Sequence, residues 1–438
     1  CADGRIPLDG EIAGLCAVDP CPAWRILAIT FTNKAAGELK ERLSRMLGSE
    51  GEEVAAGTFH SFCARILRRD GERLGYSAHF TIYDTDDSKR LMKACMKELN
   101  IDEKTLGHKA ILGEISRAKD ELVDPPEYEA RHANGFDIRL KLVAKAYTLY
   151  QKKLADADAM DFDDLLSKTV ELFVTCPDVL ARYQGRFRYL MVDEYQDTNH
   201  AQYRLISLLA QGSGNLCVVG DDDQSIYKFR GATIDNILGF DKVYDQATVI
   251  KLEQNYRSTQ TIVDAANSLI AHNSRRLEKR CFSAAEQGSK IALVRVVEDS
   301  YEPVEVAMDI KDKARNGAQW SDFAILYRTN KQHGLFEAAL ARRGIPYRVY
   351  KGMSLLEHKD VRNMLAYFSI ILNPNDDESF KRIVNYPARG IGETTIARIE
   401  EMARRRNTSM WNAVSELVAT ANPMDQVEKV VVRKVGDF

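Results

Sequence analysis

The 438-residue chain contains no apolar run approaching the ~18 residues that a membrane-spanning helix needs, which argues against a helical membrane protein. It also has no excess of positive charge, because 61 Lys and Arg stand against 64 Asp and Glu and the formal net charge is −3. A strongly basic, histone-like protein is therefore excluded. Local binding of nucleic acid is not, since basic side chains can be concentrated in one groove.

Metal-binding cysteine patterns are absent as well. The eight cysteines form no C-x-x-C pair and show no Cys/His spacing of the kind that holds zinc. Most lie in apolar stretches, as Cys217 does within residues 216–219, and residues 1–10 lack the basic-then-apolar pattern of a secretory signal. We interpret the cysteines as reduced core residues and expect a cytoplasmic protein.

What the sequence does contain is an alternation of short apolar strands with helical stretches, which predicts an α/β fold with parallel sheets. Thr32 can cap a helix over residues 34–47, in which apolar residues recur at spacings of three and four. Strands are expected at residues 26–31, 54–58, 189–192, 216–220 and 248–252. The runs at 189–192 and 216–220 are continuously apolar, which is typical of strands buried on both faces of a sheet.

The alternation is interrupted once and then resumes, so the chain divides into about three domains of ordinary size. Lys, Glu, Leu and Ala dominate between residues 80 and 163, which predicts a helical insertion. Further strands are expected at 291–294, 323–327 and 347–350, and helices after 356. The expected organisation is a first core domain (1–79 and 164–250), the helical insertion (80–163), a second core domain (251–355) and a helical accessory domain (356–438).

Adjacent carboxylates end one of the expected buried strands. Asp193 and Glu194 follow residues 189–192 directly. Ligands of open α/β sheets bind at this end of the strands, where an Asp can hold a water of Mg²⁺ and a Glu can take the proton of an attacking water. A strand that simply ends in a polar loop would show the same pair.

Two later blocks carry side chains suited to phosphates and bases. Gln224 follows another buried strand and can contact a terminal phosphate, and Tyr227, Phe229 and Arg230 interleave aromatic rings with a cation, as base-stacking surfaces do. Arg257 lies at the expected domain boundary, where an Arg can reach a γ-phosphate across a cleft. Taken separately, an acidic loop, a half-buried helix and a surface Arg explain these residues equally well.

In this order, the blocks resemble those of the UvrD/Rep/PcrA group of superfamily 1 DNA helicases, closely and along essentially the whole chain. Each of the following stretches is similar to a motif of that family: 28–36 (motif Ia), 57–61 (Ib), 161–165 (the end of the insertion), 193–197 (II), 220–231 (III), 254–258 (IV) and 326–330. The resemblance implies two RecA-like parallel-sheet domains with helical insertions.

The resemblance also implies a set of residues for ATP and Mg²⁺. Asp193 is expected to hold Mg²⁺ through water, and Glu194 to act as general base. Gln224 is expected to sense the γ-phosphate, Arg257 to act as an arginine finger and Tyr256 to stack on adenine.

For DNA, the resemblance implies a single-strand groove and a contact with duplex at single-strand/double-strand junctions. Phe229 stands where the family commonly has Trp, and His60 could equally be a packed, hydrogen-bonded histidine. Gly390 and Gly392 are similar to a hairpin that meets duplex DNA, although a plain turn has the same sequence. The residues expected in the groove are Phe31, Thr58, His60, Phe162, Tyr227, Phe229, Arg230 and Asn330.

The sequence departs from the family at the phosphate-binding loop. That loop requires G-x-x-x-x-G-K-[ST], and at the corresponding distance before residue 26 only Gly4-Arg5-Ile6 is present, in which Arg is no substitute for Lys. The upstream adenine motif and motifs V and VI are absent too. We therefore expect a fragment of a longer ATP-dependent helicase that moves 3′ to 5′ on single strands and is itself nearly inactive.

Two other readings remain open. A homologue that binds single-stranded DNA without turnover would also lack the loop. The chain could also be the helicase part of a RecB-like helicase–nuclease. These residues contain no nuclease-type carboxylate cluster, which argues weakly against this reading, although a missing C-terminal part could contain one. The preserved Glu194, Gln224 and Arg257 favour the helicase fragment.

Overall fold

The computed structural model describes residues 21–329, 332–350 and 359–420, and the chain forms two compact units. The first unit comprises residues up to 250, residues 275–278 and residues from 363 onward; the second comprises 251–274 and 279–362. Within the described ranges, no helix is both long and apolar enough to cross a membrane.

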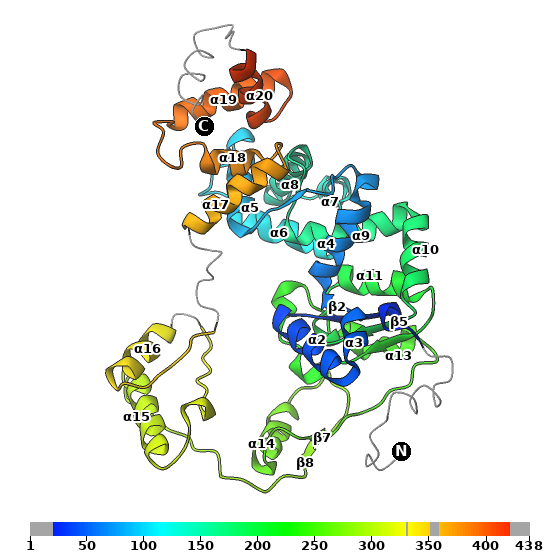
Figure 1. Ribbon diagram of the computed structural model, residues 1–438. Coiled ribbons are helices and arrows are strands. Elements are labelled where there is room, and N and C mark those ends of the chain that lie inside the picture. Colours follow the sequence, from blue (N-terminus) through cyan, green and yellow to red (C-terminus); the bar gives the residue numbers. More distant parts are fainter. Residues whose placement is uncertain (1–20, 330–331, 351–358, 421–438) are drawn as a thin grey trace. The chain divides into compact units, whose positions relative to one another are not determined.

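A four-stranded parallel sheet organises the first unit (Figure 1). Its strand order is β2-β1-β5-β6, so the last two strands along the chain extend the sheet from β1. The strands are β1 (Ile26–Thr30), β2 (Ala55–Thr58), β5 (Tyr189–Val192) and β6 (Leu216–Val218), which confirms four of the predicted strands. Since all four run parallel, their carboxyl ends meet at one edge.

Alternate residues of β1 pack on opposite faces of this sheet, as the two-residue period of a strand requires. Leu27 and Ile29 enter the main core with helices α4 (Phe59–Asp70), α9 (Phe162–Thr175), α10 (Pro177–Arg186) and α11 (His200–Ala210). Ala28 packs on the other face against α2 (Asn33–Leu47). The predicted cap of α2 is confirmed, because the Thr32 hydroxyl accepts a hydrogen bond from the Ala35 N–H at 3.1 Å.

Burial of β5 and β6 on both faces, which the apolar runs predict, is not what the structure has. Met191 and Cys217 point away from the main core and are exposed. The α2 side chains cover β1 and β2 on that face, and no described helix covers β5 and β6 there. The interpretation of Cys217 as a core cysteine was therefore wrong, whereas Cys63, Cys95 and Cys176 are buried.

A second core lies in the stretch between β3 (Thr81–Ile82) and β4 (Ala159–Met160), which pair in parallel. Its helices are α5 (Thr85–Glu98), α6 (His108–Asp120), α7 (Pro125–His132) and α8 (Ile138–Asp156). The helical character predicted here is confirmed, apart from this one short strand pair.

Four helices near the C-terminal end of the described chain form a third core: α17 (Lys359–Leu372), α18 (Asp377–Ile383), α19 (Glu393–Arg406) and α20 (Met410–Thr420). Buried polar contacts join it to the insertion. The Tyr83 hydroxyl donates to Asp376 Oδ1 at 2.9 Å, and Asn373 Nδ2 donates to the carbonyl of Asp158 at 3.0 Å.

The remaining elements of the first unit are short. They are η1 (Ala23–Arg25), α3 (Ser49–Glu53), η2 (Gly71–Leu74), η3 (Tyr195–Asp197), η4 (Asp222–Gln224), η5 (Lys228–Arg230), α12 (Asp235–Leu238) and α13 (Phe240–Val243). Of these, η3 follows the carboxyl end of β5, and η4 and η5 lie in the loop after β6; η4 and η5 contain the predicted residues Gln224, Phe229 and Arg230.

The second unit is built around a small core of α15 (Glu302–Arg315) and α16 (His333–Arg342). It also contains α14 (Gln260–Ile270), η6 (Trp320–Asp322) and a parallel pair of two-residue strands, β7 (Gln254–Asn255) and β8 (Phe282–Ser283).

The strands predicted at 248–252, 291–294, 323–327 and 347–350 are not formed. None of these runs is assigned to a ladder with a described neighbour, and Leu293 is 96% exposed. A strand is stabilised by hydrogen bonds to a partner, so an apolar run without one stays irregular. Among the described residues, the α/β character of the chain therefore lies mainly in the first unit.

Candidate functional site

The two adjacent carboxylates lie at the carboxyl end of β5, exposed at the edge of the parallel sheet. The Asp193 N–H donates to the Ile29 carbonyl at 2.9 Å, and the Glu194 N–H donates to Asp193 Oδ1 at 3.0 Å. Glu194 has a left-handed backbone, with φ 53° and ψ 40°. A non-glycine residue in this region is strained, and such strain concentrates at functional sites.

Gln196 connects Glu194 with the loop that follows β6. Its Nε2 donates to Glu194 Oε2 at 2.7 Å, while its Oε1 accepts from the Asp221 N–H at 3.0 Å. Gln224 Nε2 then donates to Asp221 Oδ2 at 2.7 Å. A continuous chain of hydrogen bonds therefore runs from Glu194 to Gln224, and Gln196 is buried within it.

Gly220 allows this close approach between the two loops. A Cβ placed on it would lie 2.4 Å from Gln196 Oε1 and 3.2 Å from the Tyr195 backbone nitrogen. Any side chain would therefore displace the Gln196 carboxamide. The sequence predicted Glu194 and Gln224 but neither Gln196 nor Gly220, although both lie inside the motif blocks.

Three aromatic rings form a row beside these loops. The Phe31 and Tyr227 ring centroids are 5.6 Å apart, and those of Tyr227 and Phe229 are 5.9 Å apart. Phe229 is 77% exposed, so it is not a core residue. Asp197, which directly follows Gln196, is buried, and burial together with the Glu194 charge raises the pKa of its carboxyl group to about 6.

A second aromatic pair is formed by His60 and Phe162. Their ring centroids are 4.2 Å apart at 31°, and Phe162 is 56% exposed. Burial lowers the pKa of His60 to about 4, so its imidazole is neutral at pH 7. His60 is thus a ring that packs on another ring and not a cation for a phosphate.

Of the other predicted DNA residues, Thr58 is buried at the N-cap of α4. Its hydroxyl accepts from the Ser61 N–H at 3.3 Å, and Ser61 Oγ accepts from the Thr58 N–H at 3.0 Å, a capping box. Arg230 ends η5. Asn330 and Gly4-Arg5-Ile6 lie outside the described residues.

The Gly390–Gly392 turn precedes α19 and is held by side chains. Asn385 Oδ1 accepts from the N–H groups of Arg389 and Ile391 at 2.9 and 3.0 Å. Gly390 has φ +69°, which favours glycine, and Gly392 is the N-cap of α19. These hydrogen bonds and the left-handed backbone of Gly390 define the conformation of the turn before α19 in the third core.

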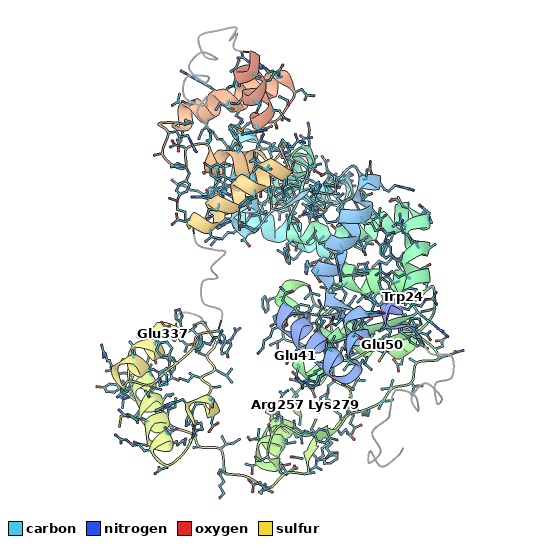
Figure 2. The ribbon with its side chains drawn as sticks, viewed as in Figure 1. Trp24, Glu41, Glu50, Arg257, Lys279 and Glu337 are labelled. Carbon is cyan, nitrogen blue, oxygen red and sulfur yellow. The ribbon has the colours of Figure 1, made fainter. Side chains whose placement is uncertain are left out.

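Tyr256 and Arg257 belong to the second unit, in the loop between β7 and α14. Figure 2 labels Arg257. Asn255 Oδ1 accepts from the Arg257 and Ser258 N–H groups at 2.9 and 2.8 Å, which fixes the turn. The Tyr256 ring is exposed, and its hydroxyl donates to Gln254 Oε1 at 2.9 Å.

The donor set at the carboxyl end of β5 fits a magnesium ion, because Asp193 offers an exposed carboxylate of the hard-oxygen type that Mg²⁺ prefers. The neighbouring acidic run has other partners. Asp223 accepts a bidentate ion pair from Arg276 at 2.7 and 2.9 Å, and Asp222 accepts from the Leu277 N–H at 2.7 Å. Asp193 is therefore the better candidate ligand.

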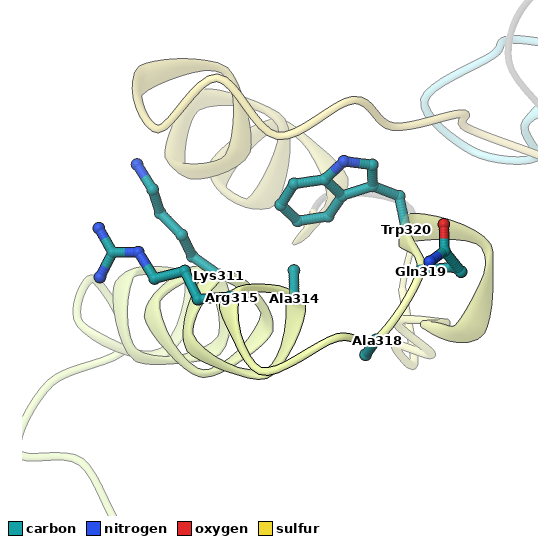
Figure 3. A pocket seen from close by; sticks show the side chains of 6 residues that line it. All are labelled: Lys311, Ala314, Arg315, Ala318, Gln319 and Trp320. Atoms are coloured by element: carbon teal, nitrogen blue, oxygen red, sulfur yellow. The ribbon is translucent and has the colours of Figure 1, made fainter.

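A cavity of about 360 Å³ lies in the second unit, between α15 and η6 (Figure 3). The Trp320 ring faces it on one side, with Lys311 and Arg315 of α15 on the other. None of the predicted site residues lines this cavity.

Comparison with known proteins finds one family over almost the whole chain. The sequence model of the UvrD/REP helicase N-terminal domain matches residues 8–245, and that of the UvrD-like helicase C-terminal domain matches residues 250–422. The ATP-dependent DNA helicase PcrA of Leuconostoc citreum is 45% identical over 396 residues, which cover 90% of this chain and 52% of that protein. PcrA of Bacillus subtilis (strain 168) is 43% identical over 431 residues, which cover 97% of this chain and 58% of that protein. The chain thus spans about half the length of these curated relatives.

Proposed function

The chain belongs to the UvrD/REP helicase family, and from that membership we propose that it is the motor core of a DNA helicase that moves 3′ to 5′ on single strands by hydrolysing ATP. Since it spans about half the length of its relatives, we also propose that these 438 residues are part of a longer protein. The domain division expected from the sequence is part of the same proposal.

In the proposed mechanism, Glu194 is the general base that takes the proton of the attacking water. Asp193 would hold Mg²⁺, and the ion would supply positive charge beside the phosphates. Gln224 contacts the γ-phosphate and Arg257 stabilises the charge that develops during its transfer. Tyr256 stacks on the adenine. The exposed Glu194 carboxylate at the carboxyl end of β5 supports this assignment.

The observation that carries the proposal is the hydrogen-bond chain from Glu194 through Gln196 and Asp221 to Gln224. It joins the residue proposed for hydrolysis to the residue proposed for γ-phosphate sensing. Ser225, two residues before Tyr227, donates its hydroxyl to the Gln196 carbonyl at 3.3 Å. A change at the γ-phosphate can therefore be transmitted to the aromatic row, which is what a motor driven by ATP requires.

The proposed single-strand groove uses the two aromatic groups. Exposed rings stack on bases of any sequence, and phosphate contacts carry no sequence information, so we expect no sequence preference. Thr58, Arg230 and Asn330 are proposed as further strand contacts. Gly390 and Gly392 are proposed to meet the duplex at a single-strand/double-strand junction.

Substitution of Phe229 tests the groove in the chain as given. Base–aromatic stacking contributes ~1–3 kcal/mol per base, so Phe229→Ala is expected to weaken oligo-dT binding about 5- to 150-fold. The loss should persist at high salt, because stacking releases no counterions. Fluorescence anisotropy over a salt series measures it.

Phe136→Ala is the matched control, since Phe136 is fully exposed but lies outside the motif blocks. It should leave oligo-dT affinity unchanged. If folded Phe229→Ala protein binds as tightly as the parent, the groove assignment is wrong.

The second candidate function is that of a homologue that binds single-stranded DNA without turnover, which the absence of G-K-[ST] from the sequence favours. The two candidates differ in one result. Only the helicase regains DNA-stimulated ATP hydrolysis when the complete reading frame is expressed.

A further inference from the structure

A buried ion cluster joins the end of α6 to the start of α9. Lys119 Nζ lies 2.7 Å from Asp161 Oδ2 and 2.9 Å from Asp164 Oδ1, and all three side chains are almost completely buried. The pKa of Lys119 is raised above its ordinary value, because the two carboxylates outweigh the effect of burial. The lysine is therefore a charged residue within the fold.

The two carboxylates also build the N-terminus of α9. Asp161 Oδ1 accepts from the Asp164 N–H at 2.9 Å, and Asp164 Oδ2 accepts from the Asp161 N–H at 3.2 Å, which closes a capping box. Tyr150 and Gln151 of α8 donate to the remaining oxygens at 3.1 and 3.0 Å. Every carboxylate oxygen thus has a partner, and the orientation of the first turn of α9 is fixed.

Phe162 is the first residue of that turn, directly after Asp161. Its ring leaves the cluster, is more than half exposed and packs on His60. The direction of this ring depends on the backbone of Asp161 and Phe162, and the buried cation on α6 holds that backbone in place.

We propose that Lys119 is a positioning residue for single-stranded DNA: through Asp161 and Asp164 it holds Phe162 against His60 in the orientation that stacks on a base. The inference rests on the proposed groove and assigns a role in it to a residue of the helical insertion. Lys119 itself touches no base, since its ammonium group is buried between the carboxylates.

Three variants of the chain test this proposal. Lys119→Met keeps the apolar stem but leaves two buried carboxylates without their cation. Lys119→Met/Asp164→Asn loses one positive and one negative group together, so the net charge of the cluster is −1, as in the parent. This double variant also keeps Asp161 as the N-cap of α9. Lys168→Met is the control, since Lys168 lies on α9 itself and pairs with Glu171 at 2.7 Å.

Oligo-dT binding is measured for each, with and without Phe162→Ala. Phe162→Ala alone should weaken binding about 5- to 150-fold. Lys119→Met/Asp164→Asn should weaken it within the same range, and adding Phe162→Ala should then cause little further loss, because both changes remove the same stacking contact. Lys168→Met should leave the affinity unchanged.

A second readout follows the ring contact without DNA. NMR titration of His60 should give a pKa of about 4 in the parent. In Lys119→Met/Asp164→Asn the pKa should rise toward its ordinary value of 6.5, because the Phe162 ring no longer covers the imidazole.

The outcomes separate the two claims. Fully additive losses, or unchanged affinity of the folded double variant, would overturn the role of Lys119. If Phe162→Ala alone has no effect on DNA binding, the groove assignment fails instead, and the role of Lys119 in DNA binding fails with it. The His60 titration then shows whether Lys119 still orients Phe162.

Discussion

Asp120, which follows Lys119 at the end of α6, should make the stability of the chain depend on pH. Its Oδ1 accepts from Asn199 Nδ2 at 2.5 Å, and its Oδ2 lies against Gly231, where a Cβ would approach to 2.7 Å. Burial, together with the charges of Asp163 and Glu121, raises the pKa of Asp120 from 3.8 to about 7. Asp120→Asn keeps an acceptor for Asn199 and removes the charge.

The size of the effect follows from the raised pKa. Ionisation of Asp120 is less favourable in the folded chain than in the unfolded chain. The charged carboxylate therefore lowers the free energy of unfolding at every pH at which it is ionised in the folded chain. Each pKa unit corresponds to ~1.4 kcal/mol, which sets an upper limit of about 4 kcal/mol. Partial contact with water reduces this, and we expect Asp120→Asn to be more stable than the parent by about 1–3 kcal/mol at pH 8.

The pH window is equally specific. Below about pH 4 the carboxyl group is protonated in both folded and unfolded chains, so the advantage of the variant should vanish. Between about pH 4 and 7 it should grow, and above about pH 7 it should stay constant. Urea denaturation followed by circular dichroism from pH 4 to 9 measures it.

Asp245→Asn is the matched control, since Asp245 is exposed and its loss changes the net charge by the same amount. It should change the free energy of unfolding little at any pH. An advantage of Asp120→Asn that is the same at pH 4 and pH 8 would show that the effect does not come from ionisation of Asp120.

Two further predictions concern the loop contacts and the chemistry of the chain. Gly220→Ala should lower the free energy of unfolding by about 1–3 kcal/mol, because the new Cβ would displace the Gln196 side chain. The control Gly37→Ala, in α2 with open space around it, should raise the free energy of unfolding by ~1 kcal/mol. Equal effects of the two substitutions in urea denaturation would contradict this prediction. The 438-residue chain alone lacks G-K-[ST] and should hydrolyse ATP at least ~10³-fold more slowly than an intact motor. A steady-state rate near ~1 s⁻¹ in the presence of oligo-dT would be inconsistent with this prediction.

The sequence predicted the first unit well because its local signals agree with one another. Residues 26–31 form an apolar run, Thr32 caps the helix that follows, and the structure has β1 and α2 there. The runs at 291–294 and 323–327 look the same in sequence but form no strand. A strand depends on a partner distant in sequence, and a run of apolar residues does not reveal whether that partner is present.

In the site, too, the sequence predicted individual residues but not the contacts between them. The motif blocks predicted Glu194, Gln224 and Phe229, and the structure brings the first two into one hydrogen-bond chain. Gln196 was missed because its role is visible only when β5 and β6 are neighbours. The sequence did contain an indication for Lys119. It lies four residues after Ile115 on the buried face of α6, where a charged residue requires a partner.

Glu194 is proposed as the base for ATP hydrolysis in a DNA motor, and Glu194→Gln in the protein from the complete reading frame is the decisive variant. Gln keeps the shape of Glu and can still accept from Gln196, but it cannot take the proton of water. DNA-stimulated ATP turnover should be abolished while ATP binding, measured by fluorescence or calorimetry, is retained. Turnover that survives the substitution would show that Glu194 is not the base, and loss of binding together with turnover would show that its role is structural.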